Sequence, residues 1–213
     1  MPWFISFNWD LVLDQLLLGH SLNARSYGLS RTLSEGPVLL KPHGSLNWFE
    51  RNPGRFITDK KRALIFYRKR SARIYAFREF RAPTSTTDRE YSPLIVPPLY
   101  SKDFAKPVFT TLWENCTRFL STASRVTFVG YSMPASDLHA HLIMRCGFRN
   151  QLKAKLTRAH RRSPARPAEI IIIDPSPETA TRITTMVGSQ HESRCFSTKI
   201  SDFSWDRVDA GSP

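Results

Sequence analysis

The run Glu169-Ile170-Ile171-Ile172-Ile173-Asp174 places four consecutive isoleucines between two acidic residues. β-Branched side chains favour extended backbone, and successive side chains of a strand point to opposite faces. An uninterrupted apolar run therefore predicts a strand that is buried on both faces. Such strands are typical of parallel sheets covered on both sides by helices, so this segment indicates an α/β fold.

Shorter apolar runs alternate with segments of helical periodicity along the rest of the chain. Strands are predicted at residues 5–7, 38–40, 125–129 and 194–198, and helices after Asp10, from Phe104, from Leu138 and after Pro175. This alternation predicts βα units. We expect a Rossmann-like, open, mainly parallel sheet with helices on both faces. It would form a single domain of residues 1–200, followed by a C-terminal tail, residues 201–213.

Two basic segments interrupt this pattern. Residues 49–90 are basic, irregular and rich in aromatic side chains, and we interpret them as an excursion from the core. Residues 150–167 are interpreted as a polar, basic linker. Between them, residues 92–98 are expected to be extended, because their prolines preclude a regular helix.

The charge balance is strongly positive. Thirty-one Lys and Arg residues against 18 Asp and Glu residues give a net charge of +13, concentrated in residues 60–81 and 153–166. A solvated surface is one interpretation of these charge runs. Contact with nucleic acid is the alternative, in which arginines meet phosphates and the interleaved aromatic side chains stack on bases.

Other functional classes are disfavoured by composition. The three cysteines, Cys116, Cys146 and Cys195, are far apart, which argues against a disulfide framework and a Cys-x-x-Cys zinc site. No apolar run approaches the ~18 residues that span a bilayer. The N-terminal residues do not have the pattern of a secretory signal. We expect no metal, no membrane association and a cytoplasmic location.

Polar residues follow each predicted strand where it ends. They are Asn8 and Asp10; His43 and Gly44; Gly130, Ser132 and Asp137; and Asp174. Open α/β sheets bind ligands at the carboxyl ends of their strands, so this set is the candidate site. Each member also has a structural interpretation: Asp10 as a helix N-cap, His43 as a core histidine, and Gly130 as a tight turn.

Five motifs in this order resemble the sirtuin-like NAD-binding domain of prokaryotes. They are Ser6-Phe7-Asn8-Trp9-Asp10, Lys41-Pro42-His43-Gly44-Ser45, Pro97-Pro98-Leu99-Tyr100-Ser101-Lys102, Gly130-Tyr131-Ser132-Met133-Pro134 with Asp137, and Ile173-Asp174. The resemblance spans about residue 4 to residue 177. That domain is a divergent relative of the NAD-dependent protein deacylases and is often found in antiphage defence proteins that destroy NAD.

The resemblance implies NAD as the ligand or substrate and cleavage of its nicotinamide–ribose bond. Asn8 would bind the ribose and position the attacking group, and His43 would be the general base. The implied cofactor-binding residues are Asp10, Gly44, Gly130, Ser132, Asp137 and Asp174. The residue types suit this chemistry, since histidine titrates near neutral pH and an asparagine both donates to and accepts from a ribose diol.

The chain also departs from the family pattern. A Gly-rich strand–turn–helix unit should precede Asn8 and hold the diphosphate at a helix N-terminus, and we expect this chain to lack it. The deacylase zinc module is absent, so NAD hydrolysis is expected rather than lysine deacylation. Two alternatives stay open: a non-catalytic remnant, and a nucleic-acid-associated binding module that uses the basic surface.

Overall fold

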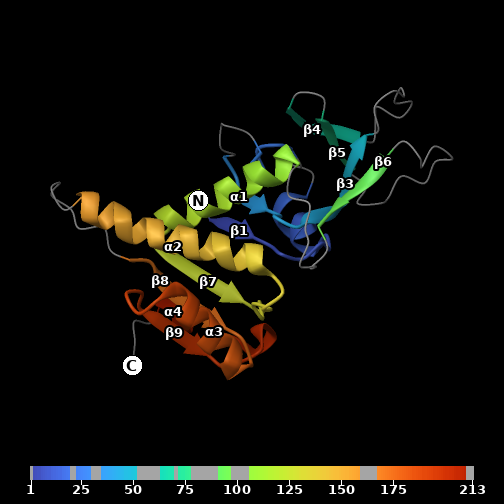
Figure 1. Ribbon diagram of the computed structural model, residues 1–213. Helices are drawn as coiled ribbons and strands as arrows, with labels where there is room; N and C mark the ends of the chain where they lie inside the picture. The colour runs from blue at the N-terminus through green and yellow to red at the C-terminus, as the bar shows by residue number, and fades with distance from the viewer. Residues whose placement is uncertain are drawn as a thin grey trace. The chain divides into compact units, whose positions relative to one another are not determined.

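The computed structural model describes residues 2–19, 23–29, 35–51, 63–69, 72–77, 91–96, 106–158 and 167–209 (Figure 1). The chain divides into two compact units, Met1–Cys116 and Thr117–Pro213. Each unit combines helices with a parallel strand pairing, so the protein is mixed α/β. Within the described residues, no helix has the length and apolar character needed to cross a membrane.

The first unit begins with a short parallel pair. β1 (Trp3–Ile5) pairs with β2 (Val38–Leu40), and Ile5 stands opposite Leu40. The Ser6 N–H extends this ladder by donating to the Leu40 carbonyl at 2.9 Å. All three β2 residues are buried, as the apolar run predicts, and β1 starts two residues before the predicted strand.

The segment after β1 is helical from Val12 and becomes the π-helix η1 (Asp14–Leu18). The Val12 N–H donates to Asp10 Oδ1 at 3.1 Å, so the Asp10 carboxylate accepts one of the first helical amides, as predicted, while Leu13 is the residue that directly precedes η1. Gly19 ends the helix with φ of 45°, and its N–H donates to the Asp14 carbonyl. The predicted strand–turn–helix unit is therefore present.

A four-stranded antiparallel sheet completes the first unit. Its strands are β3 (Gly44–Arg51), β4 (Ala63–Lys69), β5 (Ala72–Phe77) and β6 (Tyr91–Ile95), in the order β4-β5-β3-β6. The prediction that residues 49–90 are irregular is wrong for β4 and β5. Strand β5 is bonded on both sides and buries residues 74–76, so pairing overrides the basic composition. The extended conformation expected from residue 92 is confirmed as far as Val96.

The helix α1 (Pro107–Thr122) contains the boundary between the two units. In the second unit, β7 (Arg125–Val129), β8 (Glu169–Ile173) and β9 (Ser193–Phe196) form a parallel sheet in that order (Figure 1). The helices α2 (Leu138–Arg158) and α3 (Pro177–Val187) connect them. These elements match the predicted alternation, and α3 has proline in its first turn as expected.

Helical segments cover both faces of this sheet. Phe128 stands opposite Ile172 in the β7–β8 register, and the Phe128 ring lies 6.5 Å from the ring of Phe148 in α2. The other face of β8 presents Ile171 and Ile173. They cluster with Phe203, which follows the 3-10 helix η3 (Ile200–Asp202), and with Val208 of the helix α4 (Asp206–Asp209). The run of four isoleucines is therefore buried on both faces, as predicted.

The segment predicted as a C-terminal tail belongs to the fold as far as residue 209. Phe203 and Val208 pack against the isoleucines of β8. The Arg194 guanidinium donates to the Val208 carbonyl at 2.7 Å and to Glu169 Oε1 at 2.5 Å. These contacts attach the segment to β8 and β9.

The predicted linker at residues 150–167 begins too early, because α2 continues to Arg158. The side chain of Gln151 contacts the backbone at three places here. Its Nε2 donates to the carbonyls of Leu120 and Ala123, and its Oε1 accepts from the Ala168 N–H at 3.1 Å. One buried amide thus joins α2 to the end of α1 and to the residue before β8.

Candidate functional site

Two strand edges carry the candidate residues. The first edge consists of residues 6–10 and 41–45, which follow β1 and β2; because these strands are parallel and in register, both segments emerge at the same edge. The second edge consists of residues 130–137 and 174–176, which follow β7 and β8. Each edge is described within its own unit.

A buried lysine occupies the centre of the first edge. Lys41 follows β2 directly, and its side chain is 1% exposed. Its Nζ donates to Asp14 Oδ2 and to Ser45 Oγ, each at 2.8 Å. It also donates to the backbone carbonyls of Asp10 and, at 3.5 Å, Trp9. The ammonium thus contacts η1, the segment after β1 and the segment after β2.

The partner carboxylate is equally buried. The side chain of Asp14 is 0% exposed, and its Oδ1 accepts a hydrogen bond from the hydroxyl of Tyr27. Burial lowers the pKa of Lys41, and the Asp14 charge opposes that shift. Burial, followed by the Asp14 charge, raises the pKa of Tyr27 far above its ordinary range. The phenol is therefore a permanent donor here, and the ion pair has a complete set of partners.

The first edge brings the segments of Asn8 and His43 together. The Phe7 ring meets the His43 ring edge-on, with centroids 5.3 Å apart, and Trp113 packs on His43 at 5.8 Å. The Leu46 N–H donates to the Trp9 carbonyl at 3.0 Å. His43 is buried, whereas Asn8 is exposed and donates its backbone N–H to Ser6 Oγ at 3.3 Å. The asparagine side chain is thus accessible to a ligand.

Gly44 has a structural role that explains its lack of a side chain. Its φ is +84°, and a Cβ at this position would lie 2.0 Å from the Leu94 carbonyl oxygen. Only glycine permits this approach of β3 to β6. Its prediction as a cofactor-binding residue stays a prediction.

The second edge is more open. Gly130 follows β7 with φ of +58°, and among the described residues no atom lies within 4 Å of the position of an added Cβ. Its N–H donates to the Ile173 carbonyl at 3.1 Å, which places it beside the end of β8. Asp174 follows β8 and accepts the Ser176 N–H on Oδ1 at 2.9 Å. The backbone at Gly130 can therefore be approached closely by a ligand.

Asp137 and Ser132 complete the second edge. The carboxylate of Asp137 is buried at the start of α2, where it accepts the Ala140 N–H at 3.5 Å and the Tyr131 hydroxyl at 3.3 Å. Burial, followed by the Asp137 charge, raises the pKa of Tyr131. The carbonyl of Ser132 accepts from Arg182 of α3 at 2.9 Å and 3.2 Å. The turn after β7 is thereby held to α3.

The predicted set therefore divides between the units. Asn8, Asp10, His43 and Gly44 belong to the first edge, and Gly130, Ser132, Asp137 and Asp174 to the second. Sequence reasoning missed the supporting residues Lys41, Asp14, Tyr27, Ser45 and Arg182. A lysine directly after a wholly apolar strand, together with an acidic residue in an apolar helix, was the available signal for the buried pair.

The remaining predictions concern metals and partners. In the part of the chain that the structure describes, no group of three or more His, Cys, Asp or Glu side chains is placed to hold a metal ion. The side chains of the basic segments 60–81 and 153–166 lie outside the described residues apart from residues 74–76. The segment 97–102, one of the five motifs, also lies outside them. Compared with protein-family models, curated proteins and solved structures, the chain matches none.

Proposed function

We propose that this chain is a sirtuin-like NAD-binding protein of Rossmann-like fold that hydrolyses the nicotinamide–ribose bond of NAD. The observation that carries the proposal is the first edge. An asparagine and a histidine follow two adjacent parallel strands, and Lys41 bonds to the segments of both. The resemblance extends the proposal to antiphage defence in the prokaryotic cytoplasm.

The proposed roles follow from residue chemistry. Asn8 has an exposed amide that can donate to one ribose hydroxyl and accept from the other. His43, oriented by Phe7 and Trp113, accepts the proton of the attacking water. Water bonds to the ribose carbon, and the nicotinamide leaves with the electron pair of the broken C–N bond. The products are nicotinamide, ADP-ribose and a proton.

Taken within its own unit, the second edge has features that suit contact with a nucleotide. Among the described residues, no atom lies within 4 Å of a Cβ built on Gly130, so its backbone is accessible to a ligand. Asp174 stands at the carboxyl end of a buried parallel strand. In dinucleotide-binding folds, acidic residues at this position accept hydrogen bonds from ribose hydroxyls. Asp137 serves the same edge by fixing the start of α2.

The direct test is NAD turnover by the purified full chain, followed by chromatography. We expect nicotinamide and ADP-ribose in equal amounts, and we expect Asn8→Ala and His43→Ala to abolish both. Asn150→Ala, an exposed asparagine on α2, is the matched control and should retain wild-type turnover. NAD that is bound but never consumed would reduce the proposal to a binding protein. NAD that is neither bound nor consumed would overturn it.

A second candidate function rests on the net charge of +13. A chain of this charge would bind a polyanion, and the arginines and aromatic residues of 60–81 suit a nucleic acid. Binding to a labelled oligonucleotide should then weaken steeply with salt. It should fall further in an Arg68→Ala/Lys69→Ala/Arg70→Ala variant and persist in His43→Ala. The reverse pattern, loss with His43→Ala alone, would contradict a nucleic-acid function.

A further inference from the structure

The buried ammonium of Lys41 joins three segments that are distant in sequence. Lysine has three donor hydrogens and no acceptor. Here they face Asp14 of η1, Ser45 at the start of β3, and the carbonyl of Asp10, with the Trp9 carbonyl at 3.5 Å. Two of these acceptors are backbone carbonyls beside Asn8. Lys41 itself precedes His43 by two residues, so one side chain contacts the surroundings of both.

Burying this charge is unfavourable unless every partner is in place. Lysine is almost never fully buried, and a buried ion pair adds little net stability compared with apolar residues of similar volume. Its best-attested benefit is a defined geometry, because the ammonium is satisfied in only one arrangement of its acceptors. The geometry that this ion pair defines is that of the first edge.

We propose that Lys41 is the positioning residue of the first edge: its ammonium holds the Trp9–Asp10 carbonyls against the His43 turn, so that Asn8 and His43 keep a fixed relative position. This proposal rests on the proposed function for its catalytic consequence. Its structural content concerns only the first unit and is tested separately.

Two further contacts connect the same segments and provide a readout. The Leu46 N–H donates to the Trp9 carbonyl at 3.0 Å, next to the carbonyl that Lys41 holds. The Phe7 ring packs on the His43 ring. If Lys41 positions the Trp9–Asp10 segment, loss of its charge should loosen the Leu46 hydrogen bond. The Leu39 amide lies two residues before Lys41 but bonds to the Ser26 carbonyl, at 2.8 Å, and not to the Trp9–Asp10 segment, so its exchange should be unaffected.

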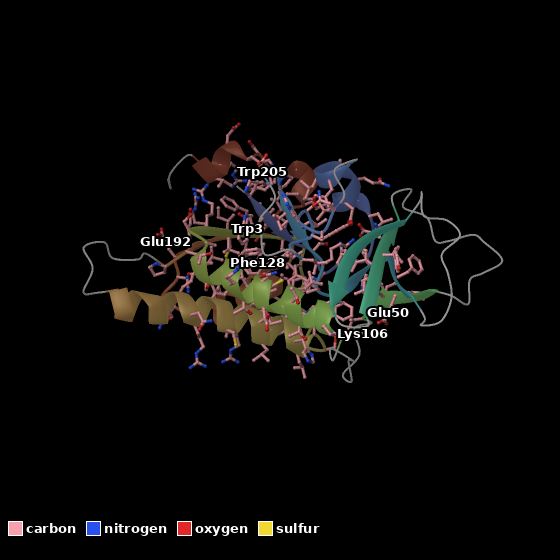
Figure 2. The ribbon with its side chains drawn as sticks, turned by 90° about the horizontal axis from the view of Figure 1, so that it is seen from above. Trp3, Glu50, Lys106, Phe128, Glu192 and Trp205 are labelled. Carbon is pink, nitrogen blue, oxygen red and sulfur yellow. The ribbon has the colours of Figure 1, made fainter. Side chains whose placement is uncertain are left out.

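The test uses a variant that removes both charges. Lys41→Met/Asp14→Asn has similar side-chain volumes and leaves an acceptor for the Tyr27 hydroxyl. Ser45→Ala is the milder second variant, since it removes one acceptor and retains the ion pair. The control is Glu50→Leu/Lys106→Met, which removes a partly exposed ion pair of the same unit (Figure 2). These two residues do not belong to the first edge.

Hydrogen exchange of the full chain, followed residue by residue, decides the structural content. In Lys41→Met/Asp14→Asn we expect the Leu46 amide to exchange about tenfold faster, with the Leu39 amide unchanged. Ser45→Ala should give a smaller increase at Leu46, and the control variant none. Wild-type exchange at Leu46 in the double variant would overturn the proposal. Equal acceleration at Leu46 and Leu39 would also overturn it, because it would mean general destabilisation.

NAD turnover then tests the catalytic consequence. A small displacement of reacting groups can lower kcat about 100-fold, so we expect that loss in the double variant with little change in KM. The control variant should keep wild-type kcat. A wild-type chain that does not consume NAD contradicts the proposed function but leaves the exchange result standing. Faster Leu46 exchange with unchanged kcat would show that Lys41 holds the segment without positioning catalysis.

Discussion

The two edges hold their carboxylates in different ways. At the first edge, Lys41 bonds to Asp14 and to the Asp10 carbonyl, 27 and 31 residues away in sequence. At the second edge, Asp174 and Asp137 bond to amides only two and three residues further along the chain. The first edge exists only when distant segments have assembled. The second combines local turns and helix caps with the two bonds from Arg182 to the Ser132 carbonyl.

This difference affects how much stability a substitution at each edge should cost. A local cap contributes its own hydrogen bond and little else, so its loss is modest and confined. A buried ion pair with four acceptors is lost as a unit, since removing one partner leaves the others buried and unsatisfied. The first edge should therefore be the more sensitive of the two.

The largest expected effect is that of Lys41→Met alone. It leaves the Asp14 carboxylate buried without its cation, and breaking a buried pair in this way costs about 3–5 kcal/mol of unfolding free energy. Urea denaturation followed by tryptophan fluorescence suits the test, because four of the five tryptophans lie in the first unit. Lys41→Met/Asp14→Asn should lose clearly less. Equal losses would mean that the ion pair does not act as a unit.

A matched pair of glycines sharpens the comparison. Gly44→Ala brings a Cβ against the Leu94 carbonyl at a positive φ and should cost about 3 kcal/mol. Gly130→Ala has the same backbone problem but open space, and should cost about 1 kcal/mol. Thermal unfolding of both variants gives the difference. Similar losses would remove the distinction between a crowded and an open edge.

Asp137→Ala probes a local cap of the second edge. The variant loses the acceptor for the Ala140 amide and the Tyr131 hydroxyl, and we expect a loss of about 1 kcal/mol. Asp137→Asn keeps a side-chain oxygen and should retain most of the stability. Urea denaturation followed by circular dichroism measures both. A loss as large as that of Lys41→Met would contradict the idea that Asp137 acts as a local cap.

The smallest effect is expected from Glu169, an ion-paired side chain of the second unit. The hydrogen bond from Arg125, with help from Arg194, lowers the pKa of Glu169 below its ordinary value of 4.5. A carboxylate with a lowered pKa in the folded state stabilises the fold above pH 4.5. That stabilisation is lost as the pH falls through the pKa of the folded state. For a partly exposed pair this amounts to about 0.5 kcal/mol. At neutral pH, Glu169→Gln should lower the free energy of unfolding by this amount. In acid, the variant and the wild type should be equally stable.

The same contrast separates what the sequence could predict from what it could not. The Asp10 bond to the Val12 amide, the proline in the first turn of α3, the buried β8 and the second-unit strands follow from local patterns, and they are present as predicted. For Lys41, the sequence predicted no role beyond its place in the motif of residues 41–45. Its burial depends on Asp14, which no local pattern brings to it, and lysines are ordinarily exposed.

Composition misled where pairing or packing supplied the order. The strand β5 lies in a basic segment, yet it is central because β3 and β4 bond to its two sides. The helix α2 continues past residue 150, and Gln151 bonds there to three backbone partners. A run of charged residues indicates which side chains are solvated. It does not predict where a strand or helix ends.

The attachment of Phe203 and Val208 to β8 has a practical consequence for handling the protein. Cutting the chain before residue 200 would uncover Ile171 and Ile173, an apolar strip on a sheet face. Uncovered strips of this kind promote association between molecules. A shortened chain should therefore elute from a sizing column as oligomers, and affinity tags at this end belong beyond Asp209.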